Sequence, residues 1–123
     1  MGALARDISQ SGVSAGTAQG MNGRVATGLT AAGTVITDAL DLNATVNVVS
    51  TVAASSGVQL YSMQIGDEME VYNGGANTLT VYPDSSTVGI NQLAVGTGIS
   101  LAQYTGCKFR KVSATQIIGF LSA

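Results

Sequence analysis

From Val25 onward, apolar and polar residues alternate along much of the chain, and Val and Thr are frequent among them. Alternation with a period of two is typical of strands that bury one face, and β-branched residues favour pleated structure. Glycine, Asn and Asp interrupt the pattern at short intervals, and no stretch keeps a helical period. The pattern therefore predicts an all-β domain over residues 25–123. Eight short strands are expected, at residues 34–40, 45–52, 58–61, 68–72, 78–82, 98–101, 107–112 and 116–121.

The clearest local prediction is a β-hairpin between residues 68–72 and 78–82. The connecting segment, residues 73–77, reads Asn-Gly-Gly-Ala-Asn, and Asn and Gly supply the positive φ angles of tight turns. Antiparallel pairing across it places the apolar residues of both strands on one face. Pro83 then ends the second strand, because proline cannot donate to a β-ladder.

Two further features complete the expected sheet. Residues 107–112 and 116–121 predict a C-terminal hairpin joined around Ala114-Thr115, and the adjacent Val48-Val49 predicts a bulge in residues 45–52. Short strands at this spacing are typical of a small antiparallel barrel, a sandwich or a jelly roll.

Residues 1–24 differ from the rest, since small residues and glycine dominate there and large apolar residues are sparse. Such a composition is typical of a flexible N-terminal arm. Two roles remain open for it, a tail without function and an arm that orders on a partner.

The composition indicates a protein that packs against partners. Hydrophobic residues make up 46% of the chain but aromatic residues only 5%, so the core is thin and an oligomer is expected to bury more of it. Charged residues reach only 10%, and the mean hydropathy of +0.34 argues against disorder. The net charge of −2 gives no basic excess for binding nucleic acid.

The residue inventory disfavours an enzyme. The sequence has no His, which removes the commonest general base and metal ligand, and a single cysteine, Cys107, which can form neither an intrachain disulfide nor a cysteine pair for zinc. We expect no catalytic residues, no metal and no cofactor. Cys107 is expected to be a small buried hydrophobe. No signal peptide or apolar run of membrane-spanning length is recognised, so no membrane association is expected.

Two groups of polar residues have competing interpretations. Asp67, Glu68 and Glu70 could form a carboxylate pair of a glycosidase or a calcium site, but a solvated strand face is favoured. Lys108 and Arg110 share one strand face, whereas Lys111 points with Phe109. These cations either protect a sheet edge or contact an acidic partner.

The sequence also resembles a known group of proteins. Residues 66–83, which contain the strand, the Asn-Gly-Gly-Ala-Asn segment and a second strand ending in Tyr-Pro, resemble small structural proteins encoded beside major capsid genes in tailed bacteriophages. Residues 47–54, 57–60 and 112–118 are similar to the same family. The resemblance covers residues 29–121 and leaves the N-terminal arm outside.

This resemblance implies a capsid decoration, or cement, protein with a barrel, jelly-roll or β-tulip-like domain. Such a protein is made in the bacterial host cytoplasm, binds the major capsid protein on the outer surface of the virion as a homotrimer, and stabilises the shell. The alternative is a head-fibre or tail adhesion module that binds host glycans through Tyr61, Tyr72, Tyr82 and Tyr104. The expected capsid contacts are Arg6, Asp7, Arg24, Lys108, Arg110 and Lys111.

Overall fold

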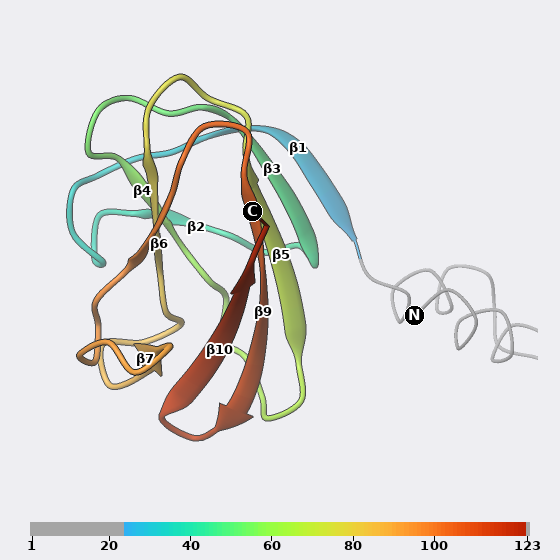
Figure 1. Ribbon diagram of the computed structural model, residues 1–123, viewed down its shortest axis with the longest axis vertical. Coiled ribbons are helices and arrows are strands. Elements are labelled where there is room, and N and C mark those ends of the chain that lie inside the picture. Colours follow the sequence, from blue (N-terminus) through green and yellow to red (C-terminus); the bar gives the residue numbers. More distant parts are fainter. Residues whose placement is uncertain (1–23, 123) are drawn as a thin grey trace, which may run out of the picture.

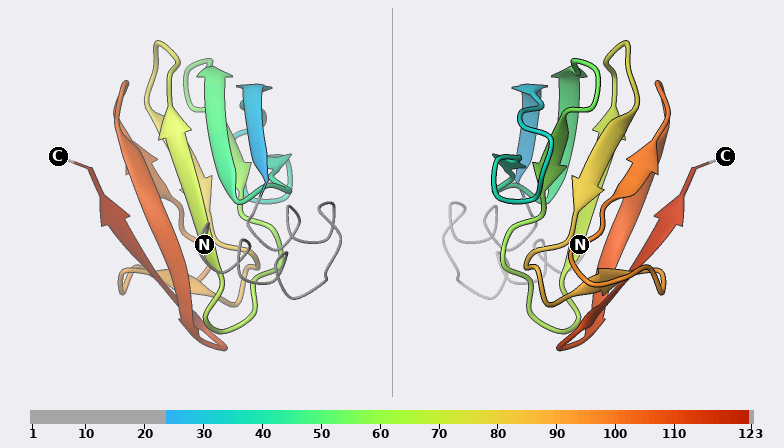
Figure 2. Two further views of the ribbon diagram at one scale, coloured as in Figure 1. Left: turned by 90° about the vertical axis from the view of Figure 1, so that its right-hand side faces the viewer. Right: turned by 90° about the vertical axis from the view of Figure 1, so that its left-hand side faces the viewer.

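The computed structural model describes residues 24–122, and within that range it shows an all-β fold of two facing sheets (Figures 1 and 2). The larger sheet has six strands in the order β1-β3-β5-β9-β10-β7, and the smaller has four in the order β2-β4-β6-β8. The strands are β1 (Val25–Thr30), β2 (Leu40–Asp41), β3 (Val46–Thr51), β4 (Gly57–Gln59), β5 (Glu68–Asn73), β6 (Leu79–Tyr82), β7 (Gly89–Ile90), β8 (Ile99–Leu101), β9 (Gly106–Ser113) and β10 (Gln116–Leu121).

The chain winds as a short coil, because successive strands alternate between the two sheets. We call each turn of this coil a rung, so that β1 with β2, β3 with β4, and β5 with β6 form the first, second and third rungs. Neighbouring rungs pair in parallel in both sheets. Val25 pairs with Val46, 21 residues later, and Val46 pairs with Glu70, 24 residues later. This winding is that of a β-solenoid.

The winding corrects two expectations, the antiparallel barrel or jelly roll and the hairpin of residues 68–72 and 78–82. Both segments are strands, but β5 lies in the six-stranded sheet and β6 in the four-stranded sheet, so they do not pair. Their apolar residues do share one core, which they reach from opposite layers. The alternation of residues identified each strand and its buried face but not the strand beside it.

Asn73 turns the chain from one sheet toward the other. Its buried side-chain amide donates to the carbonyl oxygens of Asn77 and Leu101, at 2.8 and 2.9 Å, and its Oδ1 accepts from the amide of Gly75. A Cβ at Gly75 would lie 2.7 Å from the backbone nitrogen of Val52, so the corner requires glycine. The Asn-Gly-Gly segment is therefore a corner of the coil and not a hairpin turn.

The far end of the stack is closed by antiparallel pairing. β8 pairs antiparallel with β6, and β9 pairs antiparallel with β5. β10 folds back on β9, which confirms the predicted C-terminal hairpin, and β7 extends the sheet through a two-residue parallel pairing with β10. These closing strands end the coil after its third rung.

Of two other local predictions, the strand at residues 34–40 is wrong for most of its length and the bulge is confirmed only in part. Residues 34–39 form bends and a turn, in which the amide of Asp38 donates to the carbonyl of Val35. A strand is present only at Leu40–Asp41. The irregularity expected at Val48-Val49 is present on one side of the strand only. The pairing of β3 with β5 is continuous from Val46 to Val49, whereas the pairing of β3 with β1 shifts register on both sides of Val49.

A single core lies between the two sheets. Phe109 and Met69 are its largest fully buried side chains, and most other members are valines and leucines from all three rungs. The core is mostly aliphatic, as the low aromatic content of the chain predicts. The six-stranded sheet therefore has one face against this core and a second face that points away from it.

Candidate functional site

The second face of the six-stranded sheet, which we call the outer face, carries exposed apolar side chains. The pairing aligns Val46 with Glu70, Lys108 and Phe120 in one row across β3, β5, β9 and β10. The next row aligns Val48 with Tyr72 and Gly106. Phe120 is 60% exposed and Tyr72 39%. Large apolar groups gathered on one sheet face are typical of a contact surface.

A cavity of about 330 Å³ lies in this face at Gly106, the position of the second row that has no side chain. Gly106 lines the cavity, and the amide of Ser122 donates to the Gly106 carbonyl at 2.8 Å. Tyr72 and Phe120 contribute aromatic rings to the lining. The cavity is large enough for an apolar side chain of a partner protein. Its lining includes Val46, Tyr72, Gly106, Lys108, Phe120 and Leu121.

The cations of the outer face are already paired within the sheet. Arg110 forms an ion pair with Glu68, which is its direct register partner. Lys108 pairs with Glu70 at 3.6 Å, also directly across the β5–β9 ladder. All four side chains are partly exposed. The rim of the cavity is therefore charged but locally neutral, and the solvated strand face expected for Glu68 and Glu70 is confirmed.

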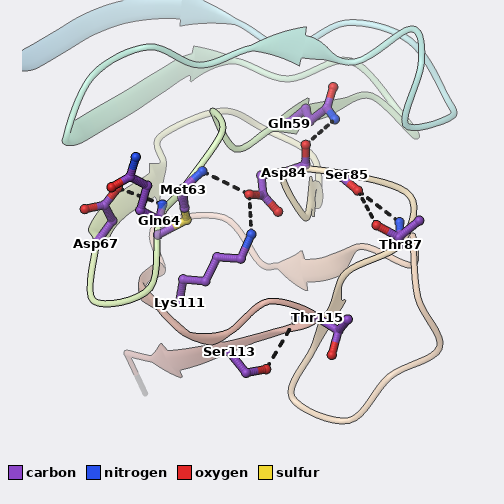
Figure 3. A network of polar contacts seen from close by, with 10 residues as sticks. All are labelled: Gln59, Met63, Gln64, Asp67, Asp84, Ser85, Thr87, Lys111, Ser113 and Thr115. Atoms are coloured by element: carbon purple, nitrogen blue, oxygen red, sulfur yellow. Dashed lines mark hydrogen bonds and ion pairs between the residues drawn. The ribbon is translucent and has the colours of Figure 1, made fainter.

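Lys111 has a different environment (Figure 3). Its ammonium donates to Asp84 Oδ2 at 2.8 Å, and this carboxylate oxygen also accepts from the amide of Met63. The side chains of Lys111 and Asp84 are only 10% and 4% exposed. Lys111 shares the inward side of β9 with Phe109, as predicted, and its charge does not reach the outer face. It ties β9 to the segment that follows β6.

The remaining expected contact residues lie at the start of the chain. Arg24 is exposed, and its carbonyl accepts from the amide of Val46 at 2.9 Å, directly before β1. Arg6 and Asp7 lie outside the described residues, as does nearly all of the predicted arm. Of the four described residues, Lys108 and Arg110 lie on the outer face and Lys111 points inward, so these four do not form one patch.

The acidic residues before and in β5, and the single cysteine, have separate environments. Asp67 uses its carboxylate to accept from the amide of Gln64, so it does not converge with Glu68 and Glu70. Within residues 24–122, no cluster of three potential metal-ligating His, Cys, Asp or Glu side chains occurs. Cys107 is buried, as expected, and burial raises the pKa of its thiol to about 12. A thiol with that pKa is protonated at neutral pH and is a poor nucleophile.

The four tyrosines occupy separate environments. Tyr72 borders the cavity, and Tyr104 is 65% exposed in the segment before β9. The Tyr82 hydroxyl donates to the carbonyl of Thr34 at 3.0 Å. Tyr61 packs against the core, and its pKa is raised by burial and, to a smaller degree, by the charge of Asp67.

Sequence reasoning missed the outer-face site because its parts come from distant segments. Tyr72 and Phe120 are 48 positions apart and meet only through the order β5-β9-β10. One signal was present, since Phe120 and Leu121 follow each other at the end of a strand, where alternation alone would leave one of them exposed.

Comparisons of this chain with protein families, with curated proteins and with solved structures found no match. Among the described residues, no helix has the length and apolar character needed to cross a membrane.

Proposed function

We propose that this protein is a structural protein of a bacteriophage virion that binds the major capsid protein on the outer surface of the head, as a homotrimer, and stabilises the shell. The phage assignment rests on the resemblance of residues 29–121 to small proteins encoded beside capsid genes. The observation that carries a binding role is the apolar cavity of the outer face, bounded by Tyr72 and Phe120.

The chemistry of this face suits a protein partner. Its exposed apolar groups offer area whose burial stabilises a complex at about 25 cal/mol per Å². Its charges need no counter-charge from the partner, since Glu70 and Lys108 neutralise each other. A decoration protein is present in many copies on one shell, so weak contacts of each copy add up.

The test uses capsids from a phage lacking the gene for this protein, to which the purified protein is added back. We expect wild-type protein to sediment with the capsids and to raise the temperature at which they release DNA. The Phe120→Asp variant is expected to lose binding by about tenfold or more, because a carboxylate would enter an apolar contact.

Ile65→Asp is the matched control, because Ile65 is 67% exposed and lies in the segment between β4 and β5. It is expected to bind like wild type. Absence of wild-type protein from the capsid pellet would refute the virion role. Light scattering tests the trimer separately, and a mass other than three times 12.3 kDa would contradict it.

A further inference from the structure

The corner after β5 contains a chemically reactive pair, Asn73 followed by Gly74. The backbone nitrogen that follows an asparagine can attack the side-chain amide carbon and close a succinimide ring. Glycine favours this attack, because it has no side chain to hinder the approach and its backbone reaches the required conformations readily. The chain passes through this corner as it leaves β5 for β6 (Figure 2).

The folded corner keeps the two reacting groups apart. The Gly74 nitrogen, which would be the nucleophile, donates its hydrogen to the Val49 carbonyl at 2.8 Å. The Asn73 side chain is fully buried, and its Nδ2 donates to two carbonyl oxygens while its Oδ1 accepts from the amide of Gly75. Ring closure would break the Gly74 hydrogen bond and turn the side chain away from its partners. The pair can therefore react only after the corner opens.

The products of the reaction do not fit the corner. Hydrolysis of the succinimide leaves aspartate or isoaspartate, whose carboxylate only accepts hydrogen bonds. The carbonyls of Asn77 and Leu101, which now receive the Asn73 amide at 2.8 and 2.9 Å, would face a buried negative charge. Isoaspartate also adds a methylene to the backbone. A Cβ at Gly75 would already lie 2.7 Å from the backbone nitrogen of Val52, so the corner has no room for it.

We propose that Asn73-Gly74 is a site of spontaneous deamidation that makes unfolding of this protein irreversible. The Gly74 nitrogen loses its proton to solvent and bonds to Asn73 Cγ, the bond from Cγ to Nδ2 breaks, and ammonia leaves. One water molecule then opens the ring at either carbonyl. The step needs no enzyme and no redox partner. It is independent of the proposed role in the virion.

The first test compares the folded and unfolded full chain in the same mildly alkaline buffer, without and with denaturing urea. Peptide mapping by mass spectrometry follows conversion at Asn73. We expect conversion to be at least about tenfold slower in the folded protein, because the reaction must wait for the corner to open. In urea, Asn22-Gly23, the other such pair in the sequence, supplies the reference rate of an unfolded dipeptide. Equal rates at Asn73 with and without urea would overturn the proposal.

The second test asks whether the product can refold. Protein held for increasing times in alkaline urea is returned to buffer, and the molecules that regain resistance to protease are isolated and mapped. We expect the refolded yield to fall as Asn73 converts, and the refolded molecules to be depleted of both products. Products present in the refolded molecules in the same proportion as before refolding would overturn the proposal.

Gly74→Ala is the matched control variant. A Cβ at Gly74 would approach nothing beyond its chain neighbours closer than the Val49 carbonyl oxygen, at 3.5 Å, so the corner accommodates alanine. The added methyl group hinders the attack of the backbone nitrogen. The variant is expected to refold like wild type at the start and to keep its yield during an incubation in which wild type loses it. Equal loss of yield in the two proteins would overturn the proposal, since the damage would then lie elsewhere in the chain.

Discussion

The first rung and the closing strands are the two ends of one stack, and they are held by different means. At the closing end, polar side chains add hydrogen bonds and an ion pair to the backbone pairing of the strands. Lys111 binds Asp84, Asn73 binds the carbonyl of Leu101, and Asn91 both donates to and accepts from the backbone of Gly119. At the first rung, β1 has backbone pairing with β3 and half-covered apolar residues.

The two ends differ in how much polar side chains add to the mostly aliphatic core. Parallel rungs are joined along their backbone ladders, to which Asn47 of the second rung adds hydrogen bonds to the carbonyls of Ala44 and Glu70. The antiparallel strands reverse the direction of the coil and must be fixed at particular positions. Buried polar groups serve this purpose because each demands one partner in one geometry. The free energy of unfolding is therefore expected to respond most strongly to substitutions of the polar side chains that connect the closing strands.

The largest effect is expected for Lys111→Met, which leaves the Asp84 carboxylate buried without its cation. Loss of one partner of a buried ion pair destabilises by about 3–5 kcal/mol, measured here as the free energy of unfolding in urea. The double variant Lys111→Met with Asp84→Asn removes the orphaned charge and is expected to recover part of that loss. A double variant less stable than Lys111→Met alone would show that the pair is not the source.

An intermediate effect is expected for Asn73→Ala, which removes three hydrogen bonds at a buried corner. Each contributes about 1 kcal/mol, so a loss of about 2–3 kcal/mol is expected in urea unfolding. Asn77→Ala is the comparison, since its side chain makes one such bond, to the Val52 carbonyl, and about 1 kcal/mol is expected. Equal losses in the two variants would contradict the role of Asn73 as the corner residue.

The smallest effect is expected for Glu70→Gln, which removes one exposed ion pair from the middle of the large sheet. Its partner Lys108 is about half exposed, so the change in unfolding free energy is expected to be at most about 1 kcal/mol. The difference from wild type should disappear at high salt, where exposed charges are screened. A larger loss of unfolding free energy that does not depend on salt would contradict this expectation, because the pair would then contribute as strongly as the buried polar contacts of the closing strands.

The sequence predicts most of the strands but, outside the C-terminal hairpin, it does not predict which strands pair with one another. Residues 68–72 and 78–82 alternate clearly, and both are strands, but a period of two does not say which strand lies alongside. Their short separation suggested a hairpin, whereas the buried amide of Asn73 directs the chain into the other sheet. The C-terminal hairpin was predictable because its partners are local, joined through Ala114 and Thr115.

The same limit applies to side chains. Alternation placed Lys111 on the inward side with Phe109, which the structure confirms. Its partner Asp84 lies 27 residues away, and nothing in the intervening sequence indicates the contact. The outer-face cavity depends on the order of four strands, β3-β5-β9-β10, so it could be found only once the sheet was assembled.

The coil also makes the chain extensible. Each rung contacts only the rungs beside it, so a segment of 21–24 residues inserted between the second and third rungs would meet the same kind of neighbour on both sides. The closing strands would lie one rung further along the stack, and the side-chain contacts of Lys111 and Asn91 would be unchanged. Proteins built in this way can lengthen or shorten by whole turns during evolution, and so change the reach of a binding face without redesigning either end.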